Sequence, residues 1–301
     1  MTSHAPAQAR SPAAALPDRA TLLAFGIVVL IGGSNAVAVR FSNLELPPFW
    51  GAGIRFGLAA LAFWAIVLLR RIPIPSGRAL LGAGLYGALG TGGGYAFFYW
   101  SLTRVPAGTS MIVLAVVPLL TLLFAYLHRL ESFRWRSAVG AALAFLGIAL
   151  SLRNGLAANT PLVYLGALLA GSACTAEASV LFKLYPRSDP VSTNAVALTA
   201  GTAVLLPLSF LVGEARDLPT GPATWAAFTY LVVIGSILLF YLYVFVLQRW
   251  TASATSYSFL LFPLVTVFVA AWLAGEAISL SLLAGTAIVI VGVWIGAFTG
   301  R

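Results

Sequence analysis

The sequence has very little charge. Only 8% of its 301 residues are Asp, Glu, Lys or Arg, whereas 60% are hydrophobic and the mean hydropathy is +0.98. A soluble domain of this length needs far more charge to cover its surface, typically about 25%. The composition therefore excludes an ordinary soluble protein and predicts a chain that lives in a lipid bilayer.

Residues that carry enzymatic or metal chemistry are also scarce. The single cysteine, Cys174, excludes an internal disulfide, and both histidines, His4 and His128, fall outside the apolar stretches. The sequence contains no HExxH, GxSxG, P-loop or CxxC pattern. An intramembrane protease or lipid transferase would need paired catalytic residues within its spans, and no such pair occurs. We therefore expect no cofactor, no metal site and no enzyme activity.

Long apolar runs are abundant. A helix needs about 20 mainly apolar residues to cross the hydrocarbon core of a bilayer. The residues before the first run, 1–20, are rich in Ala, Pro and Ser and predict a disordered tail. Charges and prolines then divide the chain into ten runs, so the predicted fold is an all-α integral membrane protein with ten transmembrane helices. They cover residues 21–39, 47–69, 79–101, 106–127, 135–152, 161–182, 191–212, 222–248, 252–273 and 278–298.

The basic residues predict how these helices are oriented. Sixteen of the seventeen are arginine, and most lie in short segments between apolar runs, which is typical of membrane topology and not of a nucleic-acid interface. With the N-terminus in the cytoplasm, twelve of them fall inside and four outside. An even number of helices returns the C-terminus to the cytoplasm. We expect two cytoplasmic termini and no nucleic-acid partner.

The chain repeats itself with a shift of 145 residues. Residues 90–147 and 235–292 are identical at twelve of 58 positions without gaps, where this composition gives about five by chance. The matches include Pro118 with Pro263 and Glu131 with Glu276. This pattern predicts two five-helix repeats, over residues 21–154 and 155–301.

An odd number of helices in each repeat places the second copy in the membrane upside down. The charges agree, because the segment around Glu131 is basic and the segment around Glu276 has no basic residue. Inverted repeats suit alternating access, in which two conformations related by the pseudo-symmetry open to opposite sides. The alternative is a duplication that only built a bundle. Because one chain contains both repeats, a monomer can form the whole pathway.

Several short features resemble the EamA-like, ten-helix branch of the drug/metabolite transporter superfamily. They are the GGSN segment at 32–35, Arg55 followed by Phe56, and the shared proline-to-glutamate spacing of the two repeats. Many relatives have a tryptophan where Gly32 or Gly33 stands here. The resemblance implies a secondary transporter in a bacterial inner membrane, exporting aromatic or neutral amino acids or similar small metabolites. It also implies an alternative, a proton-coupled multidrug exporter of lipophilic cations.

Ionisable groups inside a bilayer are costly and suggest function. Glu177, near the cytoplasmic half of the sixth run, is a candidate for binding a substrate amine or relaying a proton, or for pairing with an arginine. The resemblance adds that small four-helix members of the superfamily rely on an acidic residue in their first helix. Arg55, in the second run, either faces a substrate carboxylate, ties helices together through backbone carbonyls, or extends its side chain toward the membrane interface.

Aromatic, hydroxyl and amide side chains supply the other candidates. Aromatic residues crowd the third and eighth runs, where the repeat pairs Tyr95 with Phe240 and Phe98 with Tyr243. They either stack on a substrate or face lipid at the interface. The predicted substrate-binding residues are Ser34, Asn35, Tyr95, Tyr99, Glu177, Tyr241, Ser256 and Ser258. Glycines and mid-span prolines allow helices to bend, so the predicted hinge residues are Gly92, Gly93, Pro118 and Pro263.

Overall fold

A computed structural model of the chain describes residues 18–105, 107–132, 135–151 and 161–274, with eight further residues between 284 and 295. The predicted disorder up to residue 17, Glu276 and most of the tenth predicted helix lie outside this part. Within it, all regular structure is helical and there is no strand. Six helices are long and apolar enough to cross a membrane, and Val117–Leu127 is a shorter apolar helix.

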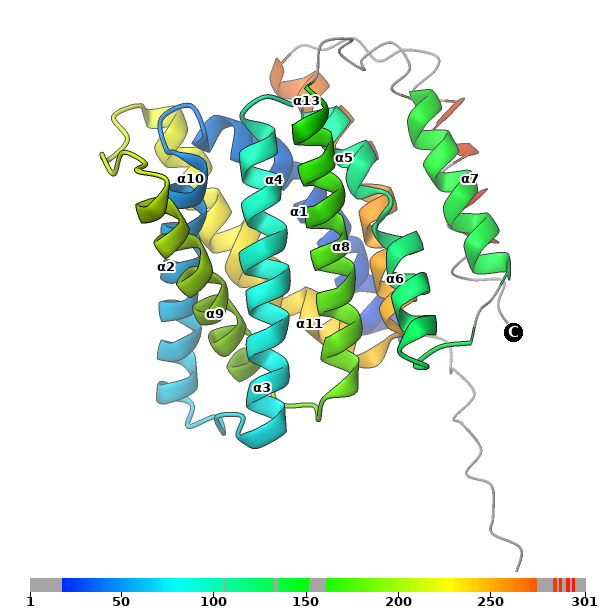
Figure 1. Cartoon of the computed structure of the whole chain (residues 1–301), viewed down its shortest axis with the longest axis horizontal. Coiled ribbons are helices and arrows are strands. Elements are labelled where there is room, and N and C mark those ends of the chain that lie inside the picture. The colour runs from blue at the N-terminus through cyan, green and yellow to red at the C-terminus, as the bar shows by residue number, and fades with distance from the viewer. Residues whose placement is uncertain are drawn as a thin grey trace, which may run out of the picture.

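The helices pack as one bundle (Figure 1). The first half contains α1 (Arg19–Ser42), α2 (Pro48–Leu69), a continuous run of α3 (Gly77–Tyr86), η1 (Gly87–Gly94) and α4 (Tyr95–Leu102), then α5 (Ala107–Leu114), α6 (Val117–Leu127) and α7 (Trp135–Ser151). The second half contains α8 (Leu162–Leu184), α9 (Pro190–Leu211), a continuous run of α10 (Pro222–Val232), η2 (Val233–Leu238) and α11 (Leu239–Arg249), then α12 (Ala252–Ser256) and α13 (Ser258–Ala274).

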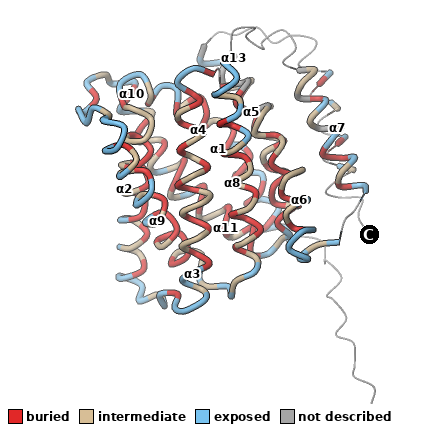
Figure 2. Tube along the Cα trace, viewed as in Figure 1, coloured by how far each residue is buried: buried red, intermediate tan, exposed pale blue. Residues whose placement is uncertain are grey.

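Buried residues gather where the two halves meet (Figure 2). The helix α1 of the first half packs against α10, α11 and α13 of the second, and α8 of the second half packs against η1, α4 and α6 of the first. The pair α2 and α9 also joins the halves. In contrast, α7 lies at the edge of the bundle (Figure 1).

The helix pair α2 and α9 shares its local geometry at both ends. Each begins at a proline, Pro48 or Pro190, whose fixed φ suits the first turn and whose missing N–H leaves no donor unpaired. Each also ends in a left-handed residue, Arg71 (φ 52°) or Gly213 (φ 70°). These are Schellman motifs, since the next amides donate back to Val67 and Ser209. The start and end of the helix thus recur 142 residues later.

These equivalent helices pack antiparallel. A Cβ added at Gly53 would meet Leu206, whereas one at Gly57 would meet Thr202. Moving forward along α2 therefore means moving backward along α9. The helices α2 and α9 hold equivalent positions in the two halves and lie side by side in opposite directions. An approximate two-fold axis perpendicular to both helices therefore relates them.

The continuous helix α3–η1–α4 is π-helical in its middle, and so is the equivalent helix α10–η2–α11 of the second half. The segment η1 covers Gly87–Gly94, and η2 covers Val233–Leu238, which is residues 88–93 shifted by 145. π-helical turns are rare and are often found at functional sites, because the wider turn leaves backbone carbonyls free to bond elsewhere. The sequence indicated only that the glycine cluster weakens this helix.

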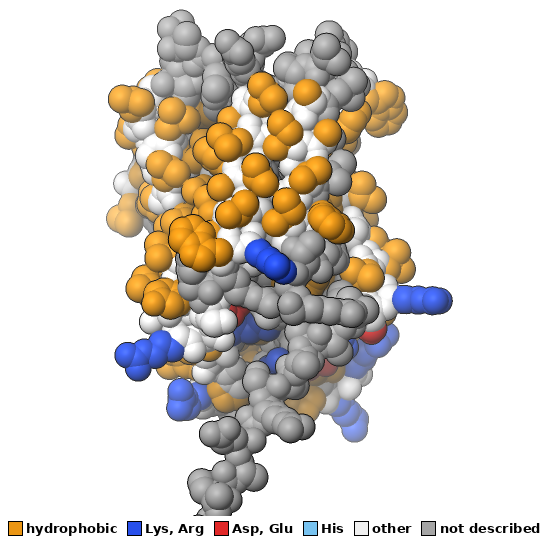
Figure 3. All heavy atoms as spheres, turned by 90° about the vertical axis from the view of Figure 1, so that its right-hand side faces the viewer, with side chains coloured by type: hydrophobic (Ala, Val, Ile, Leu, Met, Phe, Trp, Pro, Cys, Tyr) orange, Lys and Arg blue, Asp and Glu red, His pale blue; other side chains and the backbone are white. Residues whose placement is uncertain are grey.

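The surface matches a bilayer environment. On the face shown in Figure 3, hydrophobic side chains cover the upper part, and Lys and Arg side chains gather toward the lower end. Large apolar side chains such as Leu23, Leu69 and Trp272 are mostly exposed. An exposed apolar belt of this size is unfavourable in water and favourable in lipid.

Candidate functional site

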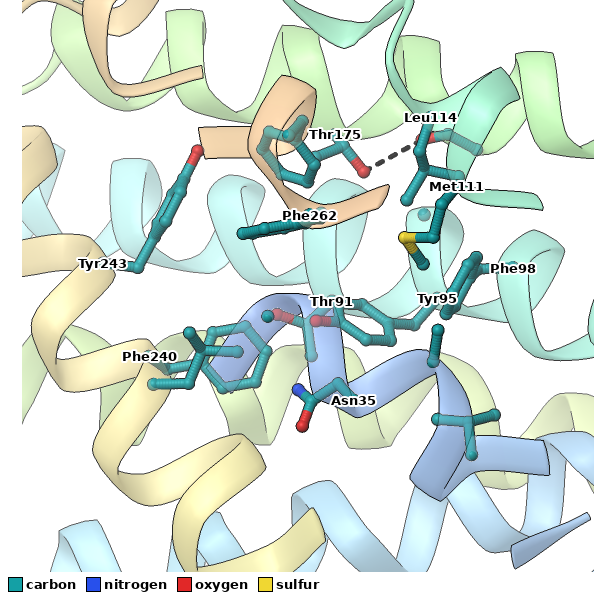
Figure 4. A pocket seen from close by; sticks show the side chains of 18 of the residues that line it. Asn35, Thr91, Tyr95, Phe98, Met111, Leu114, Thr175, Phe240, Tyr243 and Phe262 are labelled. Carbon is teal, nitrogen blue, oxygen red and sulfur yellow. Dashed lines mark hydrogen bonds between the residues drawn. The ribbon is translucent and has the colours of Figure 1, made fainter. Parts of the chain in front are cut away.

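A cavity of about 90 Å³ lies between the two halves of the chain. Its wall is built from α1, α2, α3, η1, α4, α5, α8, α11 and α13, so both halves contribute. The lining is mainly apolar and aromatic, with a few polar groups, as is common for small-molecule sites. The lining residues labelled in Figure 4 are Asn35, Thr91, Tyr95, Phe98, Met111, Leu114, Thr175, Phe240, Tyr243 and Phe262.

Four aromatic side chains line the cavity in two repeat-related pairs. Tyr95 and Phe98 come from α4, and their counterparts Phe240 and Tyr243 come from α11. The rings of Tyr95 and Phe240 lie 5.8 Å apart at an interplanar angle of 62°, an edge-to-face geometry. The ring pairing that the repeat predicted is therefore part of the wall.

Phe262 of α13 adds a further ring. A Cβ at Gly32 would collide with this ring, and one at Gly33 would collide with Val265, so only glycine lets α1 approach α13 this closely. The Thr266 hydroxyl donates to the Gly33 carbonyl over 2.6 Å and fixes the approach. The aromatic surface at this point of the wall therefore comes from α13.

Arg55 is the charged residue of the cavity wall, and it is completely buried. Its guanidinium donates to the Ser236 hydroxyl, the Tyr99 hydroxyl and the Gly235 carbonyl, each over 2.7 Å. It also lies 5.7 Å from the centre of the Tyr95 ring. In the described ranges no carboxylate contacts it. Two of the predicted roles for Arg55 can coexist, because it ties helices together and is part of the cavity wall. Its complete burial is incompatible with the third, in which the side chain extends to the membrane interface.

The predicted binding residues separate into two groups. Asn35 and Tyr95 line the cavity. Tyr99 is completely buried behind it and bonds Arg55, while Ser34 bonds the Tyr230 hydroxyl over 2.6 Å. Tyr241 packs on Phe245, with ring centres 6.4 Å apart, and is not part of the wall.

Two hydroxyls and one carboxylate of the predicted set also lie away from the cavity. Ser256 and Ser258 are completely buried and donate to carbonyls three residues earlier in their own chain. The Glu177 carboxylate accepts a hydrogen bond from His128 Nε2 over 2.7 Å, and both side chains are partly exposed. Glu177 is thus paired, as one interpretation of the sequence held, although its partner is a histidine and not an arginine.

The predicted hinge residues lie at irregular points of the helices. Gly92 and Gly93 are in η1, where they pack against Val204 and Cys174, whereas their neighbours Gly90 and Gly94 line the cavity. Pro118 is in the first turn of α6, directly after the break that separates α5 from α6. Pro263 lies inside the uninterrupted helix α13. Their part in gating stays a prediction.

Comparison with known proteins identifies the family. The model of the EamA-like transporter family matches the chain twice, over residues 19–153 and 162–297. The chain belongs to the EamA-like transporter family, which confirms the resemblance drawn from the sequence. Proteins of this family act as transporters in membranes, with small molecules as substrates.

Individual relatives of the chain are also named as transporters or exporters. The chain is 31% identical to the "Uncharacterized inner membrane transporter YedA" of Escherichia coli (strain K12), over 83% of this chain and 81% of that protein. It is 30% identical to the "Probable terminal-alkyne amino-acid exporter" of Streptantibioticus cattleyicolor, over 73% of each. The "Probable amino-acid metabolite efflux pump" of Salmonella typhimurium is 26% identical, over 91% of this chain and 94% of that protein.

A solved structure shares the fold. It superposes with a TM-score of 0.74 at 21% sequence identity, covering 92% of this chain and 96% of that one. The likeness therefore concerns the helical architecture.

Proposed function

We propose that this protein is a secondary transporter that exports aromatic or neutral amino acids, or similar small metabolites, across the inner membrane by alternating access. The observation that carries the proposal is the cavity between the halves, walled by the repeat-related aromatic pairs Tyr95 with Phe240 and Phe98 with Tyr243. Aromatic walls suit an apolar or aromatic side chain. Two relatives named for amino-acid export support the substrate class.

The geometry of the helices supports the mechanism. We propose ten spans in two inverted repeats: the six long helices, the α3–η1–α4 run, α5 with α6, α7, and a last helix toward the C-terminus. The antiparallel pair α2 and α9 and the recurring π-helical segments supply the pseudo-symmetry that alternating access needs. Both termini would be cytoplasmic, in keeping with the basic lower end of Figure 3, and a monomer would suffice.

The alternative, a proton-coupled exporter of lipophilic cations, has less support. Such a transporter needs an embedded carboxylate that faces its substrate. Among the described residues of the cavity wall the charged group is Arg55, whose positive charge repels a cation.

Counterflow uptake by purified protein in liposomes tests the function. The panel contains labelled phenylalanine, leucine and other neutral amino acids, together with one labelled lipophilic cation. We expect saturable exchange of neutral amino acids and none of the cation. Uptake of the cation alone would overturn the proposal in favour of drug export.

The same assay tests the role of Glu177. Because its carboxylate pairs with His128 away from the cavity, Glu177→Gln should leave amino-acid exchange within about twofold of the native rate. Phe240→Ala serves as the control that should lose activity. It should lower exchange about tenfold, the effect of losing roughly 1.4 kcal/mol of ring contact with the substrate. Abolition of exchange by Glu177→Gln would instead make this carboxylate essential.

A further inference from the structure

A buried positive charge without a counter-charge stands at one side of the cavity. Three of the five N–H donors of Arg55 are used by the hydroxyls of Ser236 and Tyr99 and by the Gly235 carbonyl. These partners are neutral, and the described residues supply no carboxylate to the guanidinium. A buried charge that is hydrogen-bonded but unpaired is unfavourable unless another charge compensates it.

Asn35 offers the complementary group beside it. Its Nδ2 donates to the Gly235 carbonyl over 3.1 Å, the same oxygen that accepts from Arg55, so the two side chains are neighbours. This bond fixes the amide orientation, because only the nitrogen can donate to a carbonyl. The other atom, Oδ1, is buried next to the backbone of Gly235 and has no hydrogen-bond partner, while the Asn35 side chain is one of those that line the cavity (Figure 4). A buried acceptor without a donor is rare in native structures.

Together these groups match the two charges of an α-amino acid. We propose that Arg55 and Asn35 form a head-group subsite, in which the guanidinium attracts the α-carboxylate and Asn35 Oδ1 accepts a hydrogen bond from the α-ammonium group. This inference rests on the proposed function and adds the requirement that the substrate be a zwitterion. In the low dielectric of the bundle, the charge of Arg55 acts on a carboxylate over several ångströms even without direct contact.

The charge of Arg55 has no counterpart at the pseudo-symmetric position of the second half. Counted from the starts of α2 and α9, Ala197 holds the position in the second half that Arg55 holds in the first. Ala197 is buried, its backbone packs closely on Gly87, and its methyl side chain carries no charge. Met111, Leu114 and Phe262 supply an apolar wall (Figure 4). The cavity thus has a polar end for a head group and an apolar lining for a side chain.

Competition against labelled phenylalanine in the counterflow assay tests the subsite in the native protein. The competitors are phenylalaninamide, which lacks the carboxylate, and 3-phenylpropionate, which lacks the ammonium group. We expect each to compete at least about tenfold more weakly than phenylalanine, since a site with buried polar groups discriminates strongly against analogues that leave them unpaired. Equal competition by phenylalaninamide would overturn the subsite and leave amino-acid transport standing.

Two variants then separate recognition from structural support. Asn35→Asp places a carboxylate next to Arg55 and neutralises the site, so competition by the cationic phenylalaninamide should rise about tenfold relative to phenylalanine. Arg55→Gln should remove the preference for phenylalanine over its amide. Ser236→Ala, which removes one bond to Arg55 and keeps its charge, should preserve that preference.

The outcomes distinguish the two proposals. If phenylalanine and leucine do not exchange in the native protein, the proposed function itself fails. If they exchange and Asn35→Asp weakens the binding of phenylalanine, phenylalaninamide and 3-phenylpropionate by the same factor, Arg55 and Asn35 only support the fold and the subsite is wrong. A changed ratio between competition by phenylalaninamide and competition by phenylalanine confirms the subsite.

Discussion

Replacing Gly87 by alanine is expected to destabilise the protein by about 3 kcal/mol or more. A Cβ at this position would collide with the backbone of Ala197, including its carbonyl oxygen. Backbone atoms cannot move aside as a flexible side chain can, so α9 would have to shift away from η1. This contact also sets the separation of the two halves next to the cavity, so transport should fall together with stability.

The neighbouring glycine provides the control. At Gly84, one turn earlier in α3, an added Cβ would have open space for 4 Å around it, so Gly84→Ala should be neutral or slightly stabilising. Thermal unfolding in detergent, followed by size-exclusion chromatography of the heated samples, compares the two variants. An unchanged melting temperature for Gly87→Ala would show that η1 and α9 do not pack as described.

Removing two loop carboxylates is expected to open the bundle at one end. Glu45, between α1 and α2, accepts hydrogen bonds from the Thr220 amide (2.6 Å), the Gly221 amide (3.0 Å) and the Thr224 hydroxyl (2.7 Å) at the start of α10. A carboxylate at a helix N-terminus is favoured by the helix dipole and the free N–H groups. Glu45 therefore ties the first half to the second.

Glu214 makes the reciprocal connection. Following α9, it accepts from the amides of Phe49 (3.1 Å) and Trp50 (2.7 Å) at the start of α2. At the positions equivalent to Glu45 and Glu214 in the other repeat, the sequence has Arg187 and Ile72, so the opposite end of the bundle lacks this pair of carboxylates. In the proposed topology the hydrogen bonds of Glu45 and Glu214 hold the external side closed.

Spin labels can follow this closure. With cysteines at the exposed residues Leu44 and Leu218 in a Cys174→Ser background, double electron–electron resonance gives the distance between the loops. Glu45→Ala with Glu214→Ala should move the distance distribution to larger values and raise external access to the cavity. Asp217→Ala removes an exposed carboxylate from the same loop and should change nothing. Identical distributions for all three proteins would contradict the account.

The pH dependence of this closure follows from the same bonds. Hydrogen bonds, that of Thr224 foremost, lower the pKa of Glu45 from 4.5 to about 2. A lowered pKa means that the carboxylate form is favoured in the closed state, so its contribution is complete above pH 4.5 and is lost as the pH falls toward 2. The loop distance should therefore stay constant around neutral pH and increase only in that acidic range.

The sequence was most informative where the repeat could be used. Aligning the halves paired Tyr95 with Phe240 and Phe98 with Tyr243, and all four line the cavity. Tyr241 is not part of the wall because successive side chains of a helix point about 100° apart, so its neighbours face the cavity and it does not. The alignment of the two repeats therefore predicted the cavity-lining residues better than the aromatic content of a helix did.

Other features depend on tertiary contacts that an apolar pattern does not contain. Hydroxyls on membrane helices often bond to a carbonyl one turn earlier, which is what Ser256 and Ser258 do, so a hydroxyl-rich segment need not face a cavity. The partner of Glu177 is His128, on another helix and 49 positions away. The unpaired Oδ1 of Asn35 is likewise defined only by its neighbours.

The most direct test of the central claim is the sided labelling of one cavity residue. Thr175 lines the cavity, and cysteine is close to it in size, so Thr175→Cys in a Cys174→Ser background gives a single reporter. A membrane-impermeant thiol reagent is added to oriented vesicles from either side, with and without phenylalanine. Alternating access predicts labelling from both sides and slower labelling when phenylalanine is present. Labelling from one side only, unaffected by phenylalanine, would contradict it.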